Sequence, residues 1–202
     1  SRSCTRTPNW YVEERSTYAS TPRSRNRSTT RSARFSSTET PLYGEPRLTV
    51  VRAPQPVTLT RGRVLLEPWT VAHDAALLEA ASPEVFRWLP AFAPTTVEEV
   101  ATIRTTHPGL PWAVVVDGVA AGSTSYLDVD CELGGLEIGW TCYRQDLWAT
   151  DVNPTCKLLL LSYAFEELGA DRVMLKTDAL NARSRAAITK LGCAFDGVLR
   201  HH

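Results

Sequence analysis

The sequence predicts an α/β protein whose helices pack around one mixed sheet. Short runs in which apolar and polar residues alternate indicate strands, and segments of helical spacing that follow capping residues indicate helices. From residue 57 onward these segments follow the order strand, helix, helix, three strands, helix, strand, helix, strand. Three consecutive strands followed by alternating helices and strands are typical of a single mixed sheet.

The first elements are a strand and two helices with a short segment between them. Thr70 is a suitable N-cap for the first helix, and Thr95 or Thr96 can cap the second. The apolar side of the first helix is expected to hold Ala75, Leu77, Leu78 and Ala81. The expected bounds are 57–67 for the strand, 71–81 for the first helix, 83–90 for a short helical turn or loop, and 97–106 for the second helix.

The later elements begin with a hairpin and end with two helix–strand pairs. Asp117 and Gly118 predict a tight turn, because glycine adopts positive φ without steric cost. Asn153 is a suitable N-cap with Pro154 in the first helical position, and Gly169 can end that helix. The expected strands are 112–116, 119–128, 136–143, 172–177 and 193–200, and the expected helices are 153–168 and 181–191.

The composition is that of a globular protein and excludes several classes. The 202 residues are 43% hydrophobic and 22% charged, with 22 basic and 22 acidic side chains. No apolar run approaches the roughly 18 residues that a membrane-spanning helix needs, so we expect no membrane segment. The balanced charge gives no whole-chain signal for nucleic-acid binding.

The five cysteines predict free thiols. None of them lies in a CxxC or CxxH arrangement, and their number is odd, so the spacing indicates neither a zinc site nor a disulfide framework. Free thiols are typical of a reducing compartment, and we therefore expect a cytoplasmic protein. The cysteines are Cys4, Cys131, Cys142, Cys156 and Cys193.

Residues 1–56 differ from the rest of the chain. They contain ten Arg and four Glu, and Ser, Thr and Arg make up 25 of the first 46 residues. Such a segment has too little apolar surface to offset the entropy of ordering, so we expect a disordered tail. An organelle-targeting leader and a basic arm that touches RNA stay open as alternatives. The predicted organisation is a tail over 1–56 and a folded domain over 57–202.

Three places could carry chemistry. The junction from Tyr143 to Pro154 leads from a strand into a helix start, whose free backbone N–H groups favour a phosphate. Asn181 and Ser184 begin the last helix, where Asn181 is either only a cap or also a ligand-binding residue. Glu137 is either a base, acting directly or through water, or part of a solvated sheet face. The four histidines have no partner spacing and are assigned no role.

Several motifs in the second half of the chain follow one another in the order typical of a known family. Together they closely resemble the GNAT N-acetyltransferases of the RimJ/RimL branch, which acetylate protein N-termini and some small amines. The resemblance covers about residues 57–202. The motifs are LEIGWT at 136–141, WATDVNP at 148–154, KLLLL at 157–161, AFEELG at 164–169, LKTD at 175–178, NARSRAAI at 181–188 and GVLR at 197–200.

The resemblance implies the GNAT fold, with a mixed and mostly antiparallel sheet flanked by helices. It implies acetyl-CoA as co-substrate and a primary amine, either a protein N-terminus or a small amine, as acceptor. Acetyl-CoA binds in this family where two neighbouring strands splay apart. The backbone that would cradle its pyrophosphate belongs to Trp148, Ala149, Thr150, Asp151, Val152 and Asn153, and Asn181 would also contact the cofactor.

The resemblance also suggests which residues act on the reacting atoms. Ser184 would serve as general acid for the thiolate, and Glu137 as the base that keeps the amine neutral. The strand through Gly139, Trp140 and Thr141 would offer a backbone N–H to the thioester carbonyl. We expect no metal.

The sequence departs from the family at two points. The family loop reads Trp-Gly-Thr-Gly, and this chain has Ala149 and Asp151 at the two glycine positions, so a negative side chain is expected beside an anion site. Family members continue beyond residues 197–200 with another strand, so the domain is expected to be truncated at its C-terminus, with an exposed sheet edge.

Two functional hypotheses from different classes follow. The first is an acetyl-CoA-dependent N-acetyltransferase, and the second is a non-catalytic or degenerate GNAT-like module with impaired acetyl-CoA binding. RNA binding through the basic arm is a weaker third hypothesis. The acceptor and the state of dimerisation stay open, and Phe86, Trp88 and Trp112 line either the acceptor pocket or the core.

Overall fold

The computed structural model describes residues 9–14 and 51–200, and within these ranges eight strands form one sheet. The strand order is β2-β3-β4-β5-β6-β7-β1-β8. The strands are β1 (Asn9–Glu14), β2 (Leu59–Arg61), β3 (Val64–Pro68), β4 (Leu110–Val116), β5 (Val119–Asp130), β6 (Gly135–Tyr143), β7 (Arg172–Asp178) and β8 (Ala194–Arg200). The helices are α1 (Val71–Ala80), α2 (Pro83–Phe86), α3 (Val97–Thr105), α4 (Val152–Ser162) and α5 (Ala182–Lys190), with a 3₁₀ turn η1 (Gln145–Leu147) and a π-helical turn η2 (Tyr163–Glu167).

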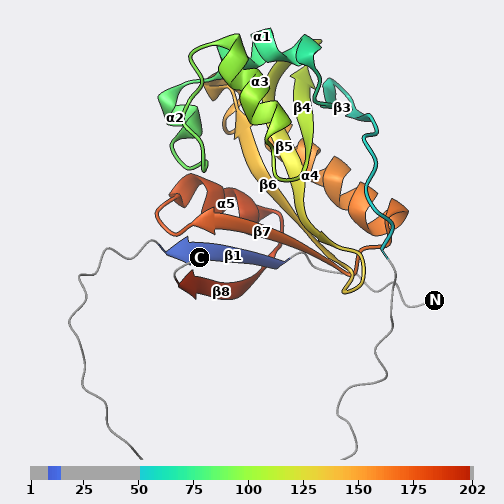
Figure 1. The fold of residues 1–202 in the computed structure, drawn as a ribbon. Helices are drawn as coiled ribbons and strands as arrows, with labels where there is room; N and C mark the ends of the chain where they lie inside the picture. The colour runs from blue at the N-terminus through green and yellow to red at the C-terminus, as the bar shows by residue number, and fades with distance from the viewer. Residues whose placement is uncertain (1–8, 15–50, 201–202) are drawn as a thin grey trace, which may run out of the picture.

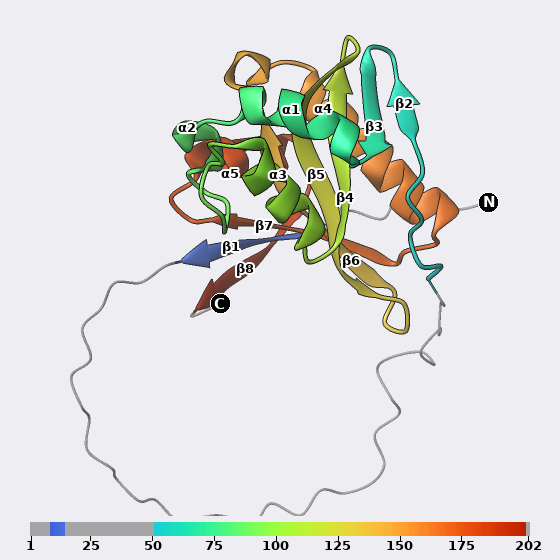
Figure 2. The same ribbon diagram turned by 45° about the horizontal axis from the view of Figure 1, so that its top comes forward.

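The predicted mixed and mostly antiparallel sheet is confirmed. Neighbouring strands from β2 to β6 run antiparallel, whereas β6, β7, β1 and β8 run parallel to one another. Helix α4 covers one face of the sheet, and α1 and α3 cover the other (Figures 1 and 2). The larger core lies under α4 around Trp112, Tyr126 and Leu160, and a smaller core under α1 and α3 includes Leu77 and Val115. Trp112 therefore belongs to the core rather than to an acceptor pocket.

The expected first strand is two strands. Gly62 has a φ of +61°, and the turn around it separates β2 from β3, which pair as a hairpin. The sequence prediction of one strand over 57–67 is therefore wrong, because the alternation of apolar residues continues through the turn. The tight turn at Asp117 and Gly118 is confirmed, with φ values of +50° and +82°.

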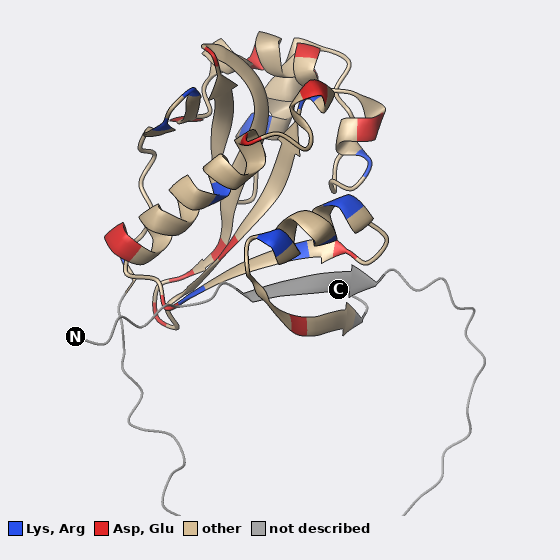
Figure 3. Cartoon of the chain, turned by 180° about the vertical axis from the view of Figure 1, so that it is seen from behind, with Lys and Arg blue, Asp and Glu red and all other residues tan. Residues whose placement is uncertain are grey.

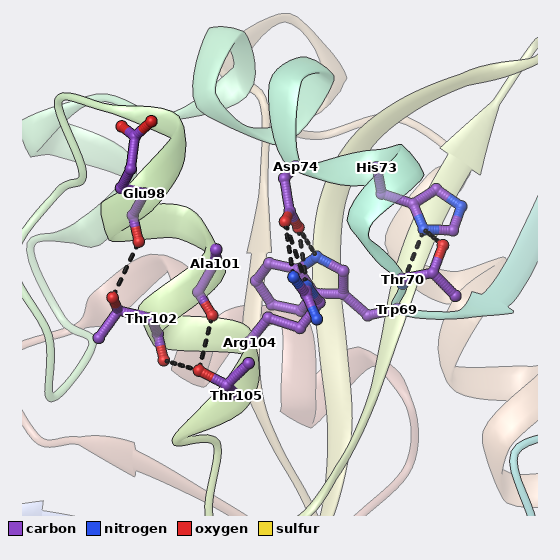
Figure 4. A network of polar contacts seen from close by, with 9 residues as sticks. All are labelled: Trp69, Thr70, His73, Asp74, Glu98, Ala101, Thr102, Arg104 and Thr105. Carbon is purple, nitrogen blue, oxygen red and sulfur yellow. Dashed lines mark hydrogen bonds and ion pairs between the residues drawn. The ribbon is translucent and has the colours of Figure 1, made fainter.

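Helix α1 begins after Thr70 as predicted, but its buried face is rotated. Leu77 and Ala80 are buried as apolar residues should be, whereas Ala75 is exposed and Asp74 is completely buried. Asp74 accepts hydrogen bonds from Arg104 of α3 and from the Trp69 indole (Figure 4). This pairing lets the helix bury a carboxylate that the apolar pattern assigns to solvent.

The start of α4 differs from the prediction. Asp151, not Asn153, is the N-cap, and Asn153 lies within the first helical turn. The Asn153 side chain does not cap the helix, because its oxygen accepts a hydrogen bond from the Tyr143 hydroxyl at 3.1 Å. Gly169 follows the helical segment with a φ of +76°, as expected for a helix stop. Helix α5 begins after Asn181 as predicted.

Strand β1 lies within the segment that the sequence assigns to a disordered tail. It runs between β7 and β8 and is parallel to both (Figure 1). Strand β7 is thus paired with β1 as well as with β6, and β8 lies at the edge of the described sheet. The remaining residues of the predicted tail up to residue 50 lie outside the described ranges, as does Cys4.

Candidate active site

The candidate active site is the wedge between β6 and β7. The two parallel strands pair only from Gly135–Arg172 to Glu137–Met174, and beyond this point they diverge. Figure 1 shows the strands starting together and separating toward their carboxyl ends, with α5 beside β7. Separation of neighbouring parallel strands leaves backbone groups of both strands free to bind a ligand.

A bulge in β6 lies at the opening of this wedge. Ser123 faces Cys142 and Ser125 faces Gly139, so β6 has one residue more than β5 between these pairs. Trp140 has a φ of +48° within the bulge, a conformation that costs energy for a non-glycine residue. Such bulges redirect a strand and occur often beside functional sites.

The bulge also reverses the side of the sheet to which Thr141 belongs. The sequence pattern places Thr141 on the face of Glu137 and Gly139, but its hydroxyl contacts Thr124 at 2.9 Å and accepts from Lys157 of α4 at 2.7 Å. Thr141 therefore lies on the α4 face, and the predicted alternation through the strand is wrong at this residue.

The loop from β6 to α4, where the sequence predicts an anion site, is held by side-chain hydrogen bonds. The Trp148 indole donates to the Tyr143 carbonyl at 2.9 Å, and the Thr150 hydroxyl donates to the Leu147 carbonyl at 2.7 Å and accepts from the Val152 N–H. Among the described residues, none offers an acceptor to the backbone N–H group of Asn153, and the Asp151 N–H has only its own carboxylate as an acceptor. The Asn153 N–H group and the positive end of the α4 dipole favour an anion.

Ala149 adopts the backbone conformation that glycine would supply at this position. Its φ is +62°, in the left-handed region that β-carbon sterics disfavour. The loop therefore keeps the turn that glycine would give, at the cost of local strain in the backbone.

The Asp151 side chain is exposed, and its negative charge is paired with a positive one. Its carboxylate accepts from the Arg63 guanidinium at 2.8 Å, and the same guanidinium reaches Asp117 at 3.0 Å. The hydrogen bond from Arg63 lowers the pKa of Asp151, so this carboxyl is ionised at neutral pH. The negative side chain expected here is therefore present, and it has a cationic partner 88 residues earlier in the chain that no sequence pattern indicated.

Glu137 is buried and ion-paired. Its carboxylate lies 2.8 Å from the Lys176 ammonium of β7, which also contacts Asp128 at 3.1 Å. Burial raises the pKa of Glu137, and Lys176 opposes this shift. Glu137 is therefore not part of a solvated sheet face. Gly139 leaves room for this side chain, since a β-carbon there would meet Glu137 Oε1 at 2.8 Å.

Asn181 and Ser184 lie at the opposite side of the wedge. The Asn181 side chain accepts the Ser184 backbone N–H at 3.1 Å, so the capping role is confirmed. The neighbouring Arg183 guanidinium stacks 3.3 Å from the centre of the Trp148 ring. This stack connects α5 to the β6–α4 loop, and Figure 3 shows α5 from behind with several basic positions.

Sequence reasoning missed three residues around the site. Arg63 forms an ion pair with Asp151, and Lys157 donates to Thr141 in the bulge. His107 shares a hydrogen bond of 3.0 Å with the Ser125 hydroxyl, and its ring packs edge-on against Trp140. The lysine within a leucine run was a visible signal for a buried charge. Arg63 and His107 gave none, because their partners are distant in sequence.

Comparison with known proteins identifies the family. A model of the GNAT acetyltransferase domain matches residues 63–194. The chain belongs to the GNAT acetyltransferase family. No curated protein sequence matches it.

Solved structures share this fold. A T. thermophilus protein assigned as an acetyltransferase is 33% identical, with a TM-score of 0.67 over 73% of this chain and 81% of that chain. A GCN5-related N-acetyltransferase from Brucella melitensis is 24% identical, with a TM-score of 0.67 over 71% and 70% of the two chains. Mycobacterium smegmatis RimJ, solved with CoA-disulfide, shares the fold at 17% identity and a TM-score of 0.56, over 66% and 74%.

Proteins of the GNAT fold use acetyl-CoA as co-substrate. Within the described ranges, no helix is long and apolar enough to cross a lipid bilayer.

Proposed function

We propose that this chain transfers an acetyl group from acetyl-CoA to a primary amine by direct attack of the amine on the thioester. The observation that carries the proposal is the wedge itself. Strands β6 and β7 separate directly after Glu137, and the bulge and the start of α4 follow on β6. The arrangement provides an opening for an extended thioester with an anion site at one end.

The β6–α4 loop and the start of α5 would bind the cofactor. The backbone from Trp148 to Asn153 would hold the pyrophosphate, and Asn181 would contact the cofactor from the other side of the wedge. The free N–H group of Asn153 at the start of α4 supports this assignment. The stack of Arg183 on Trp148 supports it further, because it keeps the two sides together.

The reaction forms a bond from nitrogen to the acetyl carbon and breaks the carbon–sulfur bond. Glu137 takes a proton from the amine directly or through water, and Ser184 protonates the departing thiolate. A raised carboxyl pKa improves a base that must work near neutral pH, and burial gives Glu137 this property. A backbone N–H from Gly139, Trp140 or Thr141 would stabilise the oxyanion. The products are the acetylated amine and free CoA.

The acceptor is a protein N-terminus or a small amine, and the chain acts in the cytoplasm as a RimJ/RimL-like enzyme. The motif order from residue 136 to residue 200 supports this branch. We assign no metal, nucleic acid or membrane partner, and dimerisation is left open.

A second candidate is a non-catalytic module of the same fold, and Ala149 favours it. The left-handed φ of +62° is strained for alanine, and any shift of this residue would displace the N–H groups of the loop.

The proposal is tested by titrating acetyl-CoA into the full chain in a calorimeter, followed by mass spectrometry of peptides and amines incubated with both. We expect micromolar binding and an added acetyl group on at least one amine. Glu137→Gln should lower kcat strongly while leaving acetyl-CoA affinity within about threefold. A folded chain that binds no acetyl-CoA at millimolar concentration would favour the non-catalytic module, and Ala149→Gly should then restore binding.

A further inference from the structure

The ion pair between Arg63 and Asp151 joins the β2–β3 hairpin to the loop that precedes α4. Arg63 Nη2 lies 2.8 Å from Asp151 Oδ1, and Arg63 Nη1 lies 3.0 Å from Asp117 Oδ2. The backbone adds a third contact, because the Asp117 N–H donates to the Arg63 carbonyl at 3.1 Å. The guanidinium is thus held between two carboxylates, one from the β4–β5 turn and one from the β6–α4 loop.

Asp151 occupies the N-cap of α4, where the chain offers its free N–H groups. A carboxylate at this place competes with a bound phosphate in two ways. It adds negative charge, and it can itself accept the N–H groups that the phosphate needs. In this structure Asp151 makes no side-chain cap hydrogen bond, because its carboxylate is turned to Arg63.

We propose that Arg63 is a positioning residue for acetyl-CoA, which draws the Asp151 carboxylate away from the α4 N–H groups and neutralises it. The inference rests on the proposed function, since it concerns binding of the pyrophosphate at the same loop. Asp117 orients Arg63 from the β4–β5 turn. Together the three side chains allow this chain to carry an acidic residue where close approach of a phosphate is required.

An anchoring role would have a different signature. If the ion pair only fixed the loop, loss of either partner would weaken acetyl-CoA binding. The double variant would then bind as weakly as the single variants. If Arg63 acts on the Asp151 charge, removing that charge makes Arg63 dispensable. The coupling energy has the same sign in both cases, so the two roles are separated by the affinity of Asp151→Asn alone and by whether the double variant recovers to that affinity.

The experiment measures acetyl-CoA dissociation constants for the full chain and for Arg63→Ala, Arg63→Gln, Asp151→Asn and Arg63→Ala/Asp151→Asn. We expect Arg63→Ala and Arg63→Gln to weaken binding about tenfold at low salt, since one unit of charge beside a diphosphate is uncovered. Asp151→Asn should bind at least as tightly as the unchanged chain. The double variant should recover to within about twofold of Asp151→Asn.

Three controls make the result specific. Arg61→Ala removes the same charge from the same hairpin and should leave binding unchanged. Where turnover is measurable, Arg63→Ala should raise the KM for acetyl-CoA and leave kcat unchanged. The KM for acetyl-pantetheine, which lacks the pyrophosphate, should not respond to Arg63→Ala.

Three results would overturn the inference. These are Arg63 variants that bind as Arg61→Ala does, a double variant as weak as Arg63→Ala, or an equal loss with acetyl-pantetheine. An unchanged chain that is folded but binds no acetyl-CoA would overturn the proposed function together with the inference. Thermal melting of each variant shows whether it is folded.

Discussion

Lys157 carries a buried amine beneath the bulge of β6. It is 5% exposed, and its ammonium donates to the Thr141 hydroxyl. Among the residues that the structure describes, no carboxylate lies within ion-pair distance of it. Burial lowers the pKa of Lys157 from 10.5 to about 8. The folded state therefore binds this proton more weakly than the unfolded chain does.

The lowered pKa has a definite consequence for stability. Below pH 8 both states hold the proton, and the folded state carries the full desolvation cost. Between pH 8 and pH 10.5 the folded state releases the proton before the unfolded state does, so the free energy of unfolding increases with pH. A shift of this size corresponds to about 3 kcal/mol.

Replacing Lys157 by methionine should therefore stabilise the protein at pH 7. We expect a gain of about 2 kcal/mol at pH 7 after loss of the hydrogen bond to Thr141, which falls through zero before pH 10.5 as the cost of burying the charge disappears. Urea unfolding across this pH range measures the effect. Lys190→Met on the surface of α5 is the control and should show no such pH dependence. A gain independent of pH would contradict the argument.

Helices α1 and α3 are joined by one buried charge pair. Asp74 is fully buried, and Arg104 reaches it with two nitrogens at 2.9 and 3.0 Å (Figure 4). A buried pair adds little net stability compared with an apolar pair of the same volume, but loss of one partner leaves an uncompensated charge. The pair therefore acts mainly as a constraint on how the two helices meet.

We expect Asp74→Ala to destabilise the protein by about 3 kcal/mol, because it leaves Arg104 and the Trp69 indole without their acceptor. The midpoint of urea unfolding measures this loss. Asp146→Ala is the matched control, since it removes a carboxylate from an exposed pair with Arg144 and should not shift the midpoint. Equal effects of the two substitutions would contradict the prediction.

Most elements were predictable from the sequence because their signals are local. Thr70, Thr96 and Asn181 cap the helices that they were predicted to cap, and Gly118 makes the expected turn. The bulge in β6 was not predictable, since no residue type marks it and Trp140 is an unusual choice for positive φ.

The charges of the site were the least predictable part. Glu137 and Asp151 were identified, but their partners Lys176 and Arg63 lie 39 and 88 residues away. Charge pairs between distant segments follow from the three-dimensional fold, which a pattern in the sequence does not contain. The same limit explains why Asn153 was predicted as a cap: its contact with Tyr143 depends on how the loop folds back.

At the scale of the whole molecule, β1 links the start of the chain to its last described strands. Its register runs from Asn9 to Glu13 against Met174 to Asp178, and it also pairs with β8. A strand paired on both sides contributes backbone hydrogen bonds along two edges. Its removal would expose the edges of β7 and β8 together.

Two truncations of the full chain test this role. Deletion of residues 1–8 keeps β1 and should leave the melting temperature unchanged. Deletion of residues 1–14 removes β1 and should lower the melting temperature by about 5 °C, as a loss of about 2 kcal/mol does in a domain of this size. It should also promote association between chains at the freed edges. Identical melting of the two truncations would show that β1 is not needed for stability.

The position of β1 also sets the order in which the sheet can be completed during synthesis. This strand leaves the ribosome before every other strand described, yet its two partners are the last of them to be made. Nearly all of the described chain must emerge before the β7–β1–β8 ladder can form, and such long-range pairing is slow. The strands from β2 to β6 can therefore pair before β1 does, and the wedge gains its far wall, β7, only when synthesis is nearly complete.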